Sequence, residues 1–241
     1  LVGILGSLWG SFANVCIYRL PLKGGVVKGR SFCPKCKKKI FWYENIPILS
    51  YLILGGKCSK CKKKISSQYL LVETISAISF LIIYYFFGIS LTSILLMILF
   101  LSFLIIFFID LKHYIIPDIL TFPMMVLGFV KSFDPNLNPI FPNYINSLIG
   151  GIFGYLIIWT IILFYKKIRN KEGMGLGDAK LFAVVGFWFG WLAIPFIIFL
   201  SSIIALLSVV PSLLKNSRTM SSEIPFGPYI IIGTIIYLFF E

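Results

Sequence analysis

Long stretches of this chain are apolar without interruption, and charged residues are confined to the segments between them. No charged residue occurs in the 36 positions between Glu73 and Asp110, or in the 34 between Lys180 and Lys215. A helix of about 20 apolar residues spans a bilayer, so each stretch is long enough for two spans. Gly88-Ile89-Ser90 and Gly190-Trp191 are the predicted turns within them. The pattern predicts an all-α, polytopic membrane protein.

Eight segments are predicted to cross the membrane, and the first is interpreted as a span shortened at its outer end. Residues 18–68 form a hydrophilic module after this first span, and residues 69–241 form a seven-helix membrane domain. The sixth span is the shortest and is rich in glycine and tryptophan. The predicted spans are 1–17, 69–87, 91–109, 115–130, 144–165, 180–190, 192–213 and 225–240.

The formal net charge of +13 is unevenly distributed, because 13 of the 22 Lys and Arg residues lie between Arg19 and Lys64. In a soluble protein such a charge suggests a nucleic-acid partner. In a membrane protein, Lys and Arg accumulate in cytoplasmic segments. If residues 18–68 are cytoplasmic, every remaining basic segment except Lys131 also falls on the cytoplasmic side. We therefore expect a cytoplasmic module, the lipid bilayer as a partner and no nucleic acid.

Four cysteines of this module form two Cys-x-x-Cys pairs with 21 residues between them: Cys33, Cys36, Cys58 and Cys61. Two such pairs together complete a tetrahedral zinc site. The alternative is two dithiols, redox-active or inert, although a cytoplasmic location disfavours disulfides. We expect zinc in a structural role, since four protein ligands leave no position for a substrate.

Three aspartates lie at or near the predicted cytoplasmic boundary: Asp110, Asp118 and Asp178. A charged residue inside a span costs about 2.5–3.5 kcal/mol on insertion scales, so these carboxylates are candidates for function. Two close carboxylates can share one proton and hydrolyse a peptide bond. Gly175 and Gly177 would let a substrate strand approach Asp178 closely. Helix capping is the alternative for all three, and it is the preferred interpretation of Asp118, which follows Pro117.

Two other classes of protein are compatible with apolar helices and carboxylates. An ion or proton transporter would need acidic residues near the middle of the bilayer and an inverted repeat. Neither is visible in the sequence. A non-enzymatic scaffold with a zinc module would have no need of the Gly-x-Gly-Asp segment that ends at Asp178.

Several sequence blocks occur in the order found in one known family. They are GSLWGSFANVCIYRLP (6–21), CPKC with CSKC, ENIPILSYLILGGKC (44–58), YLLVE (69–73), IDLKHYIIPDILTFP (109–123), EGMGLGDAKLFAVVGFWFGW (172–191) and IPFGPYI (224–230). With these blocks the chain resembles the bacterial type IV prepilin peptidases, which are GxGD-type intramembrane aspartyl proteases. The resemblance implies Asp110 and Asp178 as the catalytic pair and Asp118 as an auxiliary residue.

The resemblance also implies a substrate class and a second activity. The expected substrates are prepilins and pseudopilins, cleaved after a short basic leader at the cytoplasmic face of the bacterial inner membrane. Family members that retain the cysteine module commonly also methylate the new N-terminal amine with S-adenosylmethionine. The sequence has no glycine-rich fingerprint for this cofactor, and residues 11–73 are where its site is expected.

Overall fold

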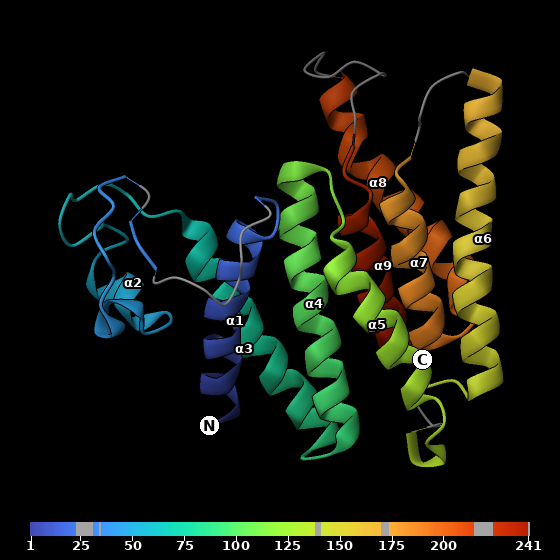
Figure 1. Cartoon of the computed structure of the whole chain (residues 1–241), viewed down its shortest axis with the longest axis horizontal. Helices are drawn as coiled ribbons and strands as arrows, with labels where there is room; N and C mark the ends of the chain where they lie inside the picture. The colour runs from blue at the N-terminus through green and yellow to red at the C-terminus, as the bar shows by residue number, and fades with distance from the viewer. Residues whose placement is uncertain (23–30, 34, 138–140, 170–173, 215–223, 241) are drawn as a thin grey trace. The chain divides into compact units, whose positions relative to one another are not determined.

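The computed structural model describes residues 1–22, 31–33, 35–137, 141–169, 174–214 and 224–240 (Figure 1). Within these ranges the regular structure is helical, apart from two isolated β-bridges. The chain divides into two compact units, Leu1–Ile105 and Ile106–Glu241. The division falls inside one helix, between Ile105 and Ile106.

Eight helices of 14 or more residues lie in the described ranges, one in each predicted span, which confirms the all-α fold. Two short 3-10 helices and the short α2 (Leu49–Ile53) lie between them. The long helices are α1 (Val2–Arg19), α3 (Ser67–Phe87), α4 (Leu91–His113), α5 (Asp118–Lys131), α6 (Tyr144–Arg169), α7 (Leu176–Phe189), α8 (Ala193–Leu214) and α9 (Gly227–Phe240).

Four of these helices are long and apolar enough to cross a bilayer: α3, α4, α6 and α8. Membrane crossing by the shorter helices stays a prediction. The two predicted turn points are confirmed, because α3 ends before Gly88 and α7 ends before Gly190. Both glycines have positive φ, at 59° and 80°, a conformation that glycine adopts without steric cost.

In the first unit, α1 and α3 approach closely through glycines. A Cβ atom built on Gly10 would lie 2.8 Å from the Cα atom of Glu73, and one on Gly6 would lie 2.7 Å from the carbonyl oxygen of Ser76. Small residues allow membrane helices to pack backbone against backbone in this way. The Asn14 side chain adds a 3.1 Å hydrogen bond to the carbonyl oxygen of Tyr69. The polar residues of α1 therefore face α3.

In the second unit, α7 is the central helix and contacts α5, α6, α8 and α9. Its side chains Leu181, Phe182 and Val184 are fully buried. A Cβ atom built on Gly186 would collide with the backbone of Gly150 in α6, so the two helices touch along their glycines. This packing explains the short, glycine-rich sixth span. A helix enclosed by protein needs no long lipid-facing surface.

The last residue of α5 is Lys131, the one basic residue predicted on the outer side. Its side chain is only 5% exposed. The Nζ atom donates a 3.1 Å hydrogen bond to the carbonyl oxygen of Trp188 and lies 3.8 Å from the centre of the Phe141 ring. Trp188 in turn donates from Nε1 to the carbonyl oxygen of Met124, at 2.9 Å. A cation is favourable at the C-terminus of a helix, so Lys131 stabilises the end of α7 opposite Asp178.

Candidate active site

Asp110 lies in the last turn of α4 and is 4% exposed. Its Oδ2 atom accepts a 3.0 Å hydrogen bond from the main-chain N–H of Gly227, the first residue of α9. The chain leaves α4 at Tyr114, which has a φ of 56° and donates its N–H to the carbonyl oxygen of Asp110. This tight exit directs the next segment back across the end of the helix.

Asp178 is the third residue of α7 and is 8% exposed. Its Oδ2 atom accepts a 3.2 Å hydrogen bond from the N–H of Gly175, which precedes the helix. A carboxylate that reaches back to the residue before a helix satisfies one of the unpaired amides there. The local sequence thus holds the Asp178 side chain against the start of its own helix.

Ile116 brings the segments around the two aspartates together. A Cβ atom built on Gly177 would lie 3.0 Å from the Ile116 Cβ atom, and one on Gly227 would lie 3.3 Å from Ile116 Cδ1. The start of α7 and the start of α9 therefore pack on the same side chain. The carboxylates of Asp110 and Asp178 are close enough to interact electrostatically. The structure thus assembles the two aspartates that the sequence singled out.

Asp118 has different surroundings. It is the first residue of α5, and its side chain is 55% exposed and forms a 2.6 Å ion pair with Lys180. This geometry agrees with the interpretation of Asp118 as a residue at a helix start.

The two motif glycines also differ from each other. Among the described residues, a Cβ atom on Gly175 would meet nothing closer than 3.7 Å, whereas Gly177 is held against Ile116. The space beside Gly175 leaves the backbone next to Asp178 accessible, and Gly177 is needed for packing.

Gly227 is the residue at this site whose contact the sequence did not predict. Its segment, Pro225-Phe226-Gly227-Pro228, opens the last predicted span. The structure begins α9 at Gly227 and directs the Gly227 amide at Asp110. The signal was a glycine between two prolines, but its partner 117 residues away was not visible.

The four predicted cysteines form one cluster in the first unit, and their Sγ atoms all lie within 4.8 Å of one another. Cys33 and Cys61 are 3.9 Å apart at sulfur, and so are Cys36 and Cys58. Four sulfurs placed about 2.3 Å from one ion at tetrahedral angles would be about 3.8 Å apart. The spacing therefore fits a four-sulfur metal site.

The two halves of the cluster have the same backbone geometry. Lys37 and Lys62 each have a φ of 56°, and each donates its N–H to the carbonyl oxygen of the first cysteine in its pair. The amide of Cys61 lowers the pKa of the Cys58 thiol to about 6, and the amide of Cys36 lowers the pKa of Cys33. Main-chain donors thus favour the thiolate form of Cys33 and Cys58, the first cysteine of each pair.

Glu44 is the one acidic residue of the cysteine module, and three neighbouring groups bind its carboxylate. Its carboxylate forms a 2.7 Å ion pair with Lys38. Hydrogen bonds from Lys38, Ser59 and the Phe41 amide lower the pKa of Glu44 to about 2. The side chain is therefore a fixed part of the module at neutral pH.

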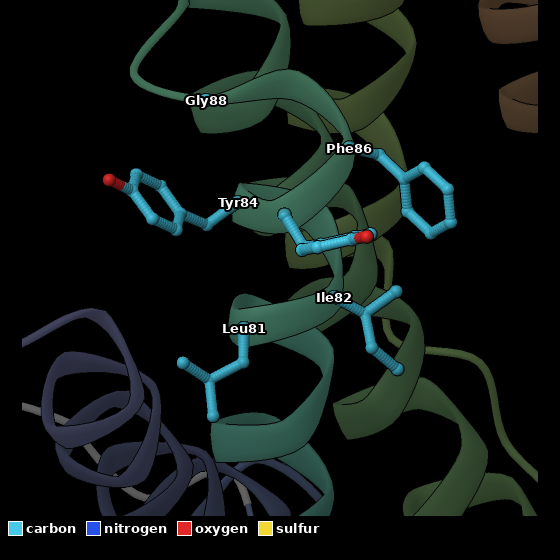
Figure 2. Close-up of a pocket in the computed structure, with 6 residues that line it drawn as sticks. Leu81, Ile82, Tyr84, Phe86 and Gly88 are labelled. Atoms are coloured by element: carbon cyan, nitrogen blue, oxygen red, sulfur yellow. The ribbon is translucent and has the colours of Figure 1, made fainter.

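One groove of about 650 Å³ lies at the end of α3 in the first unit (Figure 2). Its lining includes Leu81, Tyr84 and Phe86, and none of its six lining residues is charged. In Figure 2 the side chains of Tyr84 and Phe86 project to opposite sides of α3. Aromatic residues at a helix end are typical of a membrane–water interface. The groove has no polar group suited to peptide hydrolysis.

The fold and these two sites define a multi-pass α-helical membrane protein with a buried aspartate pair and a four-cysteine cluster. Residues 4–87 match the sequence model of the bacterial peptidase A24 N-terminal domain, and residues 95–210 match that of the type IV leader peptidase family.

Curated relatives match along nearly the whole chain. A prepilin leader peptidase/N-methyltransferase of Pseudomonas aeruginosa is 36% identical over 98% of this chain and 88% of its own length. Proteins of the same name from Vibrio cholerae and Neisseria gonorrhoeae are 36% and 34% identical, and the match covers 95% and 89% of their lengths. None of the solved structures matches the chain significantly. The chain belongs to the type IV leader peptidase family.

Proposed function

We propose that this protein is an aspartyl endopeptidase that removes the basic leader from prepilins and pseudopilins at the cytoplasmic face of the bacterial inner membrane. The observation that carries the proposal is the burial of Asp110 and Asp178 within electrostatic reach of each other, each with one carboxylate oxygen bound by a main-chain amide. The names of the relatives support the substrate class.

The amides of Gly227 and Gly175 fix one oxygen of each carboxylate. The second oxygens act on water and on the scissile carbonyl. Two adjacent carboxylates do not both ionise readily, so the pair shares one proton. The ionised member takes a proton from the attacking water, and the protonated member donates a hydrogen bond to the carbonyl oxygen. Burial keeps these charges in a low dielectric, where they act strongly.

Zinc is the proposed occupant of the four-cysteine cluster. The sulfur spacing, the amides directed at Cys33 and Cys58, and the surrounding lysines all favour a dication held by thiolates. When bound, the ion cross-links residues 31–36 to residues 57–61. A small module with few buried apolar side chains gains most of its folding free energy from such a cross-link. The role of zinc here is structural.

Methylation of the new N-terminal amine is the second proposed activity, and it rests on the names of the relatives. The groove at the end of α3 does not fit S-adenosylmethionine, because its six lining residues offer no carboxylate for the positively charged cofactor. We therefore assign no cofactor-binding residues. A gain of one methyl group in the mass of the cleaved pilin, dependent on added S-adenosylmethionine, tests this activity.

The peptidase assignment is tested with the purified full chain, a prepilin in detergent and mass detection of the released leader. Asp110→Asn and Asp178→Asn keep the size of each side chain and remove its charge. Each is expected to abolish cleavage while the melting temperature stays within about 3 °C of the wild type. Cleavage at the wild-type rate by either variant would exclude the proposed pair.

Asp118→Asn is the matched control for the same chemical change. Asp118 is exposed and paired with Lys180, so its substitution should leave most of the cleavage rate intact. A complete loss in Asp118→Asn, with activity retained in Asp178→Asn, would move the catalytic role to Asp118.

A further inference from the structure

The cysteine module carries an apolar surface between its two cysteine pairs, on the 3-10 helix η1 (Trp42–Asn45) and on α2. Trp42 is 81% exposed and Ile53 is 82% exposed. The large apolar residues exposed on this surface are Phe41, Trp42, Tyr43, Ile46, Leu49, Leu52 and Ile53. We call these seven residues the apolar tip.

The apolar tip reverses the arrangement expected of a domain surrounded by water. The small polar residue Ser50 is buried, and its hydroxyl donates a 2.8 Å hydrogen bond to the carbonyl oxygen of Tyr43. Leu49 and Leu52, on the same short helix, are more than half exposed. Each exposed aliphatic side chain forgoes the free energy of burial, so an apolar surface of this kind indicates a missing partner.

Lysines surround the apolar tip on both sides in sequence. No charged residue occurs in positions 45–56, and the flanking segments 35–39 and 57–64 contain nine lysines. Glu44 is paired with Lys38 and offsets one of these nine charges. Apolar and aromatic residues framed by lysines are typical of surfaces that enter the headgroup region of anionic membranes.

A hydrogen bond fixes the position of the apolar tip along α3. The main-chain N–H of Ile48 donates to Oε2 of Glu73 at 2.8 Å, and Glu73 is buried. Glu73 lies six residues after the start of α3 at Ser67, which is about 9 Å along the helix axis. Ile48 therefore lies level with the second turn of α3, a helix that is long and apolar enough to cross a bilayer. Figure 1 shows α2 beside α1 and α3 rather than beyond their ends.

The backbone at Ile48 is strained in a way that this bond maintains. Ile48 has φ 63° and ψ −55°, and Leu49 donates its N–H to the carbonyl oxygen of Pro47 at 2.6 Å. This is a γ-turn of positive φ, which is rare and costly for a β-branched residue. The turn reverses the chain at the residue whose main-chain amide binds Glu73.

We propose that the apolar tip inserts into the interfacial region of the bilayer, with its flanking lysines on anionic lipid headgroups. Trp42 and Ile53 enter the acyl-chain boundary, and the lysines of segments 35–39 and 57–64 remain at the phosphates. The four-cysteine cluster is thereby held against the membrane surface. This inference is independent of the peptidase activity, since it concerns residues outside the aspartate pair.

The test uses the full chain in vesicles of phosphatidylcholine with phosphatidylglycerol, with bromine atoms on the acyl chains near the headgroup as the quencher. Subtracting the emission of Trp42→Phe from that of the wild type isolates Trp42. We expect the bromolipids to quench Trp42 at least about twofold, with a blue-shifted emission, and the quenching to weaken without phosphatidylglycerol. The matched control is Trp188→Phe, because Trp188 is fully buried in protein and its isolated emission should be quenched much less.

Ile53→Asp and Ile53→Leu separate insertion from folding. The side chain is exposed, so neither change removes a packed contact. Ile53→Asp should reduce the quenching of Trp42 about twofold or more, because a carboxylate is costly at this depth, and Ile53→Leu should leave it unchanged. A Trp42 emission typical of water and unaffected by bromolipid would overturn the proposal. If Trp42 responded only after a prepilin was added, the apolar tip would belong to the substrate and the proposal would likewise be wrong.

Discussion

The main-chain N–H of Gly227 points at the Oδ2 atom of Asp110, with 3.0 Å between nitrogen and oxygen. Gly227 begins α9 and Asp110 lies in the last turn of α4, so the bond joins two helix ends. Amides at the start of a helix favour negative charge nearby. The bond therefore orients one carboxylate of the proposed pair and stabilises its ionised form.

Replacement of Gly227 by alanine should damage this arrangement. The new Cβ atom would lie 2.7 Å from Asp110 Oδ2, closer than such atoms approach, and 3.3 Å from Ile116 Cδ1, which is a tight contact. The carboxylate or the start of α9 must then move. We expect kcat/KM for prepilin cleavage to fall about tenfold or more, which corresponds to about 1.4 kcal/mol of lost transition-state stabilisation.

Gly233→Ala is the control in the same helix. Its Cβ atom would meet no atom closer than 3.5 Å, which is an ordinary contact. This variant should cleave at the wild-type rate. An equal loss of activity in both variants would attribute the effect to α9 in general and would contradict the specific role of the Asp110 contact.

The two glycines of the Gly-x-Gly-Asp segment should respond differently to alanine. Gly175 has φ −82° and ψ 150°, which any residue adopts, and its Cβ atom would have room beside Asp178. Gly175→Ala should therefore fold normally and raise KM, since the methyl group occupies space that a substrate strand needs. Gly177→Ala brings a Cβ atom within 3.0 Å of Ile116 and should lower stability by about 1–3 kcal/mol. Thermal unfolding and steady-state cleavage, measured side by side, separate the two effects.

An unchanged KM in Gly175→Ala would disprove the close approach of the substrate at this position.

The helices and the aspartate pair were accessible from the sequence because their signals are local. An uncharged stretch of 36 residues leaves few alternatives to two membrane helices, and Gly88 marks the turn between them. Asp110 and Asp178 interrupt or border apolar runs, where a carboxylate is costly. Selecting Asp110 rather than Asp118 as the partner required the resemblance to a known family. In the structure Asp118 is exposed and paired with Lys180, and the choice of Asp110 stays a prediction.

The contacts that position these elements were not accessible, because each joins residues far apart in sequence. The bond from Ile48 to Glu73 closes a 25-residue loop, and that from Lys131 to Trp188 closes 57 residues. Nothing local distinguishes Lys131 from a lysine in an outer loop, since burial depends on where Phe141 and α7 lie. The apolar residues 41–53 similarly resemble an ordinary core segment until their exposure is known.

Lys131→Met should destabilise the second unit, although methionine is apolar like the surrounding core and lysine is charged. The substitution removes the hydrogen bond to the carbonyl oxygen of Trp188 and the contact of the ammonium with the Phe141 ring. Together these contribute roughly 1–2 kcal/mol, so the melting temperature in detergent should fall roughly 2–8 °C. Lys60→Met, at an exposed lysine of the cysteine module, is the control and should change it little. A melting temperature equal to or above that of the wild type would contradict this prediction. It would show that burying the Lys131 ammonium costs more free energy than its hydrogen bond and ring contact contribute.

Metal content distinguishes the four clustered cysteines from the fifth. Cys58 lies in the cluster with Cys33, Cys36 and Cys61, whereas Cys16 is buried in α1 and belongs to no such group. We expect about one zinc per chain in the purified wild type and in Cys16→Ser, and a large loss in Cys58→Ser, because three thiolates leave a tetrahedral site incomplete.

A strong chelator should remove the ion from the wild type and expose residues 31–65 to proteolysis, since the module has few buried apolar side chains to replace the cross-link. Elemental analysis and limited proteolysis measure both effects. Equal metal content in Cys58→Ser and Cys16→Ser would mean that the metal binds elsewhere.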